Sequence, residues 1–183
     1  MTSAAALALA AIGLTACGPA RPPSPGTSGT SQSAQPAQTP QPIPSALLSQ
    51  ARPIGAGPRF HPPVSGPVSG SCAAALGPRD GVHVEVFAAD RVLLLPAGIG
   101  ARPPLASLDG RITRAGCYGA LVTLDPTGTV LVRPAARLTL GALFRSWGEP
   151  LSRTRLASFT APPGTAVSVF IDGRPWPGAP SAV

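Results

Sequence analysis

His83 and Glu85 are the residues of this chain whose types and spacing come closest to a binding site. They alternate with Val82, Val84 and Val86, and this period of two predicts a β-strand with the valines on one face. An imidazole and a carboxylate then share the other face, where they could hold a metal ion or a small ligand. A zinc site needs three or four ligands, so a solvated surface pair is the competing interpretation.

Residues for an enzyme active site are scarce in the rest of the sequence. The other histidine, His61, lies among prolines, and Asp125 stands on a predicted turn. There is no glycine-rich phosphate loop, no serine-centred nucleophile elbow and no pair of histidines at metal-ligand spacing. We therefore expect a protein without catalytic residues, without a cofactor and without a bound metal.

The first residues of the chain combine an apolar run with a cysteine. Residues 3–16 form a run of small and apolar residues that is too short to span a bilayer as a helix, which is typical of a signal peptide. Leu14-Thr15-Ala16-Cys17 resembles the lipobox of such precursors, in particular those of actinobacteria. The resemblance implies that Cys17 receives a diacylglyceryl group and becomes the first residue after cleavage. It predicts a protein anchored by lipid at the extracytoplasmic face of the cell membrane.

Lipidation would decide where the protein resides, because two acyl chains anchor stably, at about 0.8 kcal/mol for each buried CH₂ group. Only Met1 and Thr2 precede the apolar run, without the usual Lys or Arg, so we expect the natural start codon to lie upstream. The alternative for Cys17 is a buried cysteine in an N-terminal helix. The prolines that follow would prevent such a helix from continuing.

With Cys17 lipidated, as the resemblance implies, Cys72 and Cys117 are the two cysteines that remain. In the oxidising space outside the membrane we expect them to form a disulfide. Closing a loop of this size would stabilise the fold by about 4 kcal/mol in the chain-entropy model. Free thiols or a redox pair are the alternatives, although redox pairs usually have the spacing Cys-x-x-Cys.

Composition divides the chain into three parts. We predict a signal peptide over residues 1–16, a lipidated cysteine with a disordered linker rich in Pro, Ser and Gly over residues 17–65, and one small domain over residues 66–183. The linker would lift the domain off the membrane. The alternative is that apolar residues within 43–60 dock against the domain.

The domain is expected to be mainly β or α+β, with small antiparallel hairpins and one short helix. Three hairpins are predicted from alternating apolar residues and turn residues: residues 82–87 with 92–95, residues 120–124 with 129–132 around Asp125-Pro126-Thr127-Gly128, and residues 167–171 with 174–176 around Asp172-Gly173. The helix is predicted from apolar residues at helical spacing, which are Leu140, Leu143, Phe144 and Trp147. Thr139 can cap its start and Gly148 can end it, and its aromatic residues are expected in the core rather than at a ligand.

The net charge of +7 comes from 14 basic residues, all of them arginine. Arginine without lysine, together with abundant Ala, Gly and Pro, is typical of the codon bias of a high-GC genome, so mutation pressure explains part of this charge. The functional alternative is weak attraction to anionic partners, such as phospholipid headgroups or cell-wall polymers. Nucleic acid is not expected as a partner outside the cytoplasm.

A set of residues spread over 72–176 forms a second pattern: His83, Pro96-Ala97-Gly98-Ile99-Gly100, Cys117-Tyr118, Asp125, Thr139-Leu140-Gly141 and Trp147-Gly148-Glu149-Pro150-Leu151-Ser152. With these residues the chain resembles a group of uncharacterised envelope proteins. Related sequences carry a second histidine near the position of Glu85 and a His-x-His around the positions of Val122 and Leu124. If that pattern is a metal or ligand site, the resemblance carries only His83 over to this chain.

Two functions follow from these observations. The first is a non-enzymatic, membrane-anchored lipoprotein that binds an envelope protein or an anionic cell-wall partner, or that contributes structurally at the cell surface. The alternative is a metal or small-ligand binding module centred on His83 and Glu85.

Overall fold

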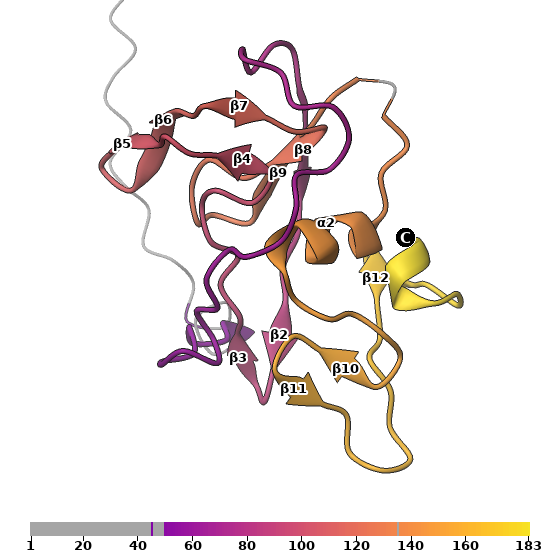
Figure 1. Cartoon of the computed structure of the whole chain (residues 1–183). Helices are drawn as coiled ribbons and strands as arrows, with labels where there is room; N and C mark the ends of the chain where they lie inside the picture. The colour runs from indigo at the N-terminus through magenta and orange to yellow at the C-terminus, as the bar shows by residue number, and fades with distance from the viewer. Residues whose placement is uncertain (1–44, 46–49, 135) are drawn as a thin grey trace, which may run out of the picture. The chain divides into compact units, whose positions relative to one another are not determined.

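The computed structural model describes residues 45, 50–134 and 136–183. They belong to a compact unit that runs from Ile43 to Val183. From residue 51 onward, the described part consists of short antiparallel strands, one α-helix and one 3-10 turn (Figure 1). This confirms the predicted small antiparallel β domain with one short helix. The predicted signal peptide, Cys17 and the first part of the predicted linker lie outside the described residues.

The strands of the described part are all short, with two to four residues each. They are β1 (Asp80–His83), β2 (Phe87–Ala88), β3 (Arg91–Val92), β4 (Ala101–Arg102), β5 (Ala106–Leu108), β6 (Arg111–Arg114), β7 (Cys117–Tyr118), β8 (Leu121–Val122), β9 (Thr129–Val132), β10 (Arg155–Leu156), β11 (Phe159–Thr160), β12 (Phe170–Ile171) and β13 (Arg174–Pro175). The helix is α2 (Leu140–Trp147), and the 3-10 turn is η1 (Pro180–Ala182).

One sheet of the described part has three strands, in the order β1-β9-β8, and both pairings are antiparallel. β8 and β9 flank the turn over residues 125–128, which confirms the predicted second hairpin. β1 joins the outer side of β9, with His83 opposite Thr129. Of the predicted valine face, Val86 is buried, whereas Val82 is 51% exposed because β1 is the edge strand and solvent reaches it from the side.

Three two-stranded hairpins close on two-residue turns in which both residues have positive φ, the pattern of a type I′ turn. The turn residues and their φ angles are Ala89 and Asp90 at 49° and 58°, Asp109 and Gly110 at 49° and 78°, and Asp172 and Gly173 at 49° and 75°. They close β2–β3, β5–β6 and β12–β13. The third is a predicted hairpin and is confirmed. The first is confirmed only next to its turn, because the predicted strand over residues 82–87 is divided: β1 pairs with β9, and β2 alone pairs with β3. β5–β6 is missing from the prediction although Asp-Gly is a favoured dipeptide for this turn.

Helix α2 begins and ends where its capping residues predict. The hydroxyl of Thr139 accepts a hydrogen bond of 3.1 Å from the backbone N–H of Ala142, and Gly148 ends the helix with a φ of 97°. Phe144 and Trp147 are almost fully buried, with their ring centres 5.5 Å apart. The aromatic residues of the helix are therefore core residues, as predicted.

The core of the unit consists of two clusters of apolar residues. The larger cluster is made of Val86, Leu93, Leu95, Ile99, Leu121, Val130, Ala142, Leu143, Phe144, Trp147 and Ala157. The smaller one is made of Ile112, Ala115, Tyr118, Val122 and Leu124. β8 lies between them, because Leu121 belongs to the first cluster and Val122 to the second.

The folded unit extends further toward the N-terminus than composition predicts. Ile54 forms a parallel bridge with Val92 of β3, and the buried indole N–H of Trp147 donates a hydrogen bond of 3.1 Å to the carbonyl of Pro62. Residues 51–65 therefore belong to the domain, and the predicted boundary at residue 65 is wrong. Prolines restrict the backbone in this segment, but its few apolar residues still pack against the core. This agrees with the alternative that apolar residues of the linker dock on the domain.

Candidate functional site

Cys72 and Cys117 are joined by a disulfide, with their Cα atoms 5.4 Å apart. This confirms the predicted pairing. The bridge links residues 45 positions apart in the sequence and attaches the segment before β1 to β7. The disulfide therefore stabilises the chain next to the smaller apolar cluster, because Tyr118, the residue after Cys117, belongs to that cluster.

Two arginines near the disulfide donate hydrogen bonds that hold the same chain segments together. The guanidinium of Arg79 donates to the carbonyls of Leu76 and Ala120, at 2.8 and 3.1 Å. Arg133 donates to the hydroxyl of Ser71 at 3.0 Å. Burial lowers the pKa of Arg79, and the nearby positive charge of Arg133 lowers it further. These arginines hold the chain around the disulfide, while Nη2 of Arg79 is buried without a hydrogen-bond partner among the described residues.

The predicted pair of His83 and Glu85 does meet on one face of the chain. The imidazole Nε2 lies 3.3 Å from a carboxylate oxygen, and the two side chains are 57% and 61% exposed. No group of three or more His, Cys, Asp or Glu side chains that could hold a metal ion occurs among the described residues. The geometry is that of a solvated surface pair.

The turn of the β8–β9 hairpin lies next to His83. A Cβ atom on Gly128, which has a φ of +82°, would lie 3.0 Å from Cε1 of the imidazole. The carboxylate of Asp125 on the same turn accepts hydrogen bonds from Arg111 and Thr127. Asp125 is thus already paired, and it adds no ligand to the histidine.

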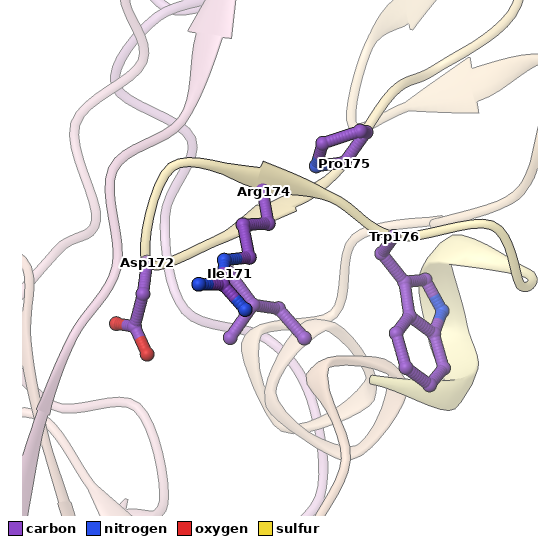
Figure 2. Close-up of a pocket in the computed structure, with 5 residues that line it drawn as sticks. All are labelled: Ile171, Asp172, Arg174, Pro175 and Trp176. Carbon is purple, nitrogen blue, oxygen red and sulfur yellow. The ribbon is translucent and has the colours of Figure 1, made fainter.

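An exposed apolar surface lies beside a depression on the β12–β13 hairpin. Figure 2 shows Ile171 and Arg174 on one face of the hairpin, with Trp176 beside them and Pro175 directed away. Phe170 is 63% exposed, Ile171 41% and Trp176 39%. The depression has a volume of about 490 Å³ and is lined by Ile171, Asp172, Arg174, Pro175 and Trp176.

Trp176 is held in place by its own neighbours. Its backbone N–H donates to the carbonyl of Val169 at 2.8 Å, and its indole N–H donates to the carbonyl of Ala179 at 3.3 Å. Gly178 lies against the indole, since a Cβ atom there would approach Nε1 to 2.6 Å. The ring is therefore oriented in advance at the surface. From the sequence, Trp176 is predicted only as a strand residue. The signal for its surface position is an aromatic residue shortly after the Asp172-Gly173 turn, in a segment with few other apolar residues.

Comparison with known proteins adds no relative: no family model matches the chain, and no curated protein and no solved structure is significantly similar to it. In the part of the chain that the structure describes, no helix has the length and apolar character to cross a membrane. The fold and surface define a small disulfide-bonded β domain with an exposed aromatic hairpin.

Proposed function

We propose that this protein is a lipid-anchored extracytoplasmic lipoprotein whose domain binds an envelope protein without catalysing a reaction. The observation that carries the binding role is the β12–β13 hairpin, which exposes Ile171 and Trp176 at a depression of about 490 Å³, with Phe170 of the same hairpin also exposed. The anchor rests on Cys17, which follows the apolar run of residues 3–16 in a lipobox-like sequence.

The chemistry of the hairpin suits a protein partner. Trp and Arg are enriched among the residues that contribute most to protein–protein binding, and the depression offers both Trp176 and Arg174. Asp172 at the turn supplies the opposite charge, so the rim can pair with either sign. A two-stranded hairpin that pairs only with itself is marginally stable, and a partner that covers its apolar side chains would stabilise it.

The binding role is tested with a photo-crosslinking amino acid at Ile171 of the full-length protein in cells of the source bacterium. We expect one dominant protein adduct, and we expect Trp176→Ala to reduce its yield at least about tenfold, as for a central binding residue. The same crosslinker at Leu108, which is 66% exposed on the β5–β6 hairpin, is the matched control and should not form that adduct. Equal adducts from both positions would contradict the proposal.

The anchor is tested separately by replacing Cys17 with serine. The variant has no thiol to acylate, so we expect it to leave the membrane fraction and to appear in the culture medium. A variant that stays in the membrane fraction to the same extent as the parent would contradict lipid anchoring.

A second candidate function is a metal or small-ligand module, which the 3.3 Å approach of His83 and Glu85 favours. The purified protein would then retain a divalent metal in stoichiometric amount after dialysis, and Glu85→Ala would lose it. Exposed side chains such as these bind weakly without further ligands, so we expect dialysis to remove any added zinc.

A further inference from the structure

The two outer edges of the β12–β13 hairpin differ in their capacity to form hydrogen bonds. Among the described strands, β12 and β13 pair only with each other, so each of them has one edge that no further strand covers. The opposing residues are Phe170 with Pro175 and Ile171 with Arg174. A free strand edge presents backbone N–H and C=O groups that can pair with another chain, unless the sequence removes them.

Prolines close the outer edge of β13. The backbone N–H of Trp176 donates to the carbonyl of Val169, so it points toward β12. Backbone groups alternate between the two edges of a strand, so the residues on either side of Trp176 point theirs outward. These two residues are Pro175 and Pro177, which have no N–H to donate. The outer edge of β13 therefore lacks backbone donors at both positions.

The outer edge of β12 keeps its donors. Because Trp176 bonds to Val169, the next pair along the ladder, Phe170 with Pro175, is of the type whose members do not bond to each other. The backbone N–H and C=O of Phe170 therefore point away from β13. Ser168 lies two positions earlier, and its backbone groups have no hydrogen-bond partner among the described residues. Both residues are exposed, so solvent reaches this edge.

The sequence favours a longer strand than the one that forms at this edge. Residues 167–171 are Val-Ser-Val-Phe-Ile, a run rich in β-branched and aromatic residues, and it predicts a strand over its whole length. Only Phe170 and Ile171 pair as β12. A third strand beside β12 would bond to the backbone groups that the rest of this run leaves without partners.

Apolar side chains flank the open edge on both faces of the hairpin. Ile171 and Arg174 lie on the face of the depression, and Pro175 is directed to the other face, which Phe170 shares because it lies opposite Pro175 (Figure 2). Phe170 is 63% exposed and Ile171 is 41% exposed. An added strand would contact Ile171 on one face and Phe170 on the other, so burial of apolar surface would add to the backbone hydrogen bonds.

We propose that the outer edge of β12, over residues 168–170, binds an extended segment of the envelope partner as a third strand of this sheet. The inference rests on the proposed binding role of the hairpin and deepens it, because it assigns the conformation of the partner and the backbone groups that recognise it. Ser168 and Phe170 would each exchange their N–H and C=O bonds with the added strand. The partner segment has apolar side chains and no proline at the paired positions.

An extended segment satisfies this edge, whereas a helix does not. The backbone N–H and C=O groups of a helix already bond within the helix, so a docked helix would leave the outward groups of Phe170 without partners. A strand supplies both a donor and an acceptor at every second residue, which is the spacing of Ser168 and Phe170.

The first test removes the outward N–H groups one at a time. The full-length protein carries the photo-crosslinking amino acid at Ile171, and the yield of its protein adduct is measured in cells of the source bacterium. Phe170→Pro and Phe170→Ala both remove the ring, but only the proline removes the backbone donor. Ser168→Pro and Ser168→Ala form a second matched pair. We expect each proline variant to give at least about tenfold less adduct than its alanine counterpart.

The second test determines the register of the added strand. The photo-crosslinking amino acid is placed at Ser168 and, in a separate protein, at Phe170, and mass spectrometry identifies the captured residue of the partner. We expect two captured residues that lie two positions apart in one segment, because paired strands advance by nearly the same distance per residue. Near-ultraviolet circular dichroism checks the fold of each proline variant, and if one is unfolded the captured spacing decides.

The outcomes separate this inference from the binding role on which it rests. Equal adduct yields from folded proline and alanine variants would overturn strand addition, as would captured residues three or four positions apart, the spacing on one face of a helix. An adduct that contains two copies of this chain would also overturn it. If the Ile171 adduct still depends on Trp176, the first two results leave the binding role intact. Failure of Ile171 to form a protein adduct would refute the binding role and strand addition together.

Discussion

Ala73 and Tyr118 exchange two backbone hydrogen bonds, of 2.9 and 2.7 Å, in the residues directly after the two cysteines of the disulfide. The covalent bridge and this pair of hydrogen bonds fasten the same two segments. Tyr118 also accepts a hydrogen bond at its hydroxyl from the backbone of Ala115, inside the smaller apolar cluster. The disulfide therefore closes a loop onto a buried part of the fold rather than onto a mobile edge.

Removal of this disulfide should destabilise the domain strongly. Replacing both Cys72 and Cys117 by alanine opens a loop of 45 residues, for which the chain-entropy model gives about 4 kcal/mol. The free energy of unfolding, measured by urea titration of chain 18–183, should fall by this amount. Ser71→Ala, which removes one exposed hydrogen bond from Arg133, serves as the control and should cost about 1 kcal/mol or less. A loss below about 1 kcal/mol in the double cysteine variant would contradict the structural role.

The hydrogen bond between Trp147 and Pro62 should hold the N-terminal segment on the domain. Trp147→Phe leaves the carbonyl of Pro62 without its donor and creates a small cavity, so we expect a loss of about 3 kcal/mol. Hydrogen exchange should accelerate selectively at the amides of Ser65 and Gly66, which donate to the carbonyl of residue 147. Phe144→Leu is the matched control, because it makes a cavity in the same helix but keeps this hydrogen bond. Equal exchange in the two variants would show that the segment does not depend on the indole.

The cap of helix α2 should contribute measurably to stability. Thr139→Ala removes the hydroxyl that accepts from Ala142, and such changes cost about 1 kcal/mol. Thr160→Ala, on the exposed face of β11, is the control and should change the free energy of unfolding by less than about 0.5 kcal/mol. Thermal unfolding of both variants under identical conditions provides the comparison, and the prediction is wrong if the two midpoints coincide.

The His83 and Glu85 pair should contribute little to stability. Both side chains are more than half exposed, so His83→Ala and Glu85→Ala should each change the free energy of unfolding by less than about 0.5 kcal/mol. Gly128→Ala should cost more than about 1 kcal/mol, because its φ is +82° and a Cβ would approach the carbonyl oxygen of Val84 to 2.7 Å. Added zinc should leave the unfolding midpoint of the parent unchanged, and a marked rise would instead favour the metal-binding alternative.

Local chemistry predicted much of the fold. Thr139 and Gly148 bound the helix because a capping hydroxyl and a left-handed residue act within one turn of the chain. Asp172-Gly173 predicted its hairpin for the same reason. The disulfide followed from the small number of cysteines, given the resemblance that assigns Cys17 to the lipid.

Long-range packing could not be predicted in the same way. Composition placed residues 51–65 in the linker, since prolines and small residues dominate there, yet Phe60 packs against Phe159 with ring centres 4.9 Å apart. Phe60 packs on the core because of its contact with Phe159, which lies 99 residues further along the chain. The hairpin around Asp172-Gly173 is predicted, but the exposure of its apolar residues is not. Alternation alone assigns apolar residues to a buried face, whereas Phe170 is 63% exposed.

The central claim, that this domain acts at a membrane through a lipid on Cys17, is tested most directly by mass spectrometry of the N-terminal peptide of the protein isolated from cell membranes. We predict a peptide that begins at Cys17 and carries the mass of a diacylglyceryl group on the thiol. A peptide that continues through residues 3–16 into an unmodified Cys17 would contradict it.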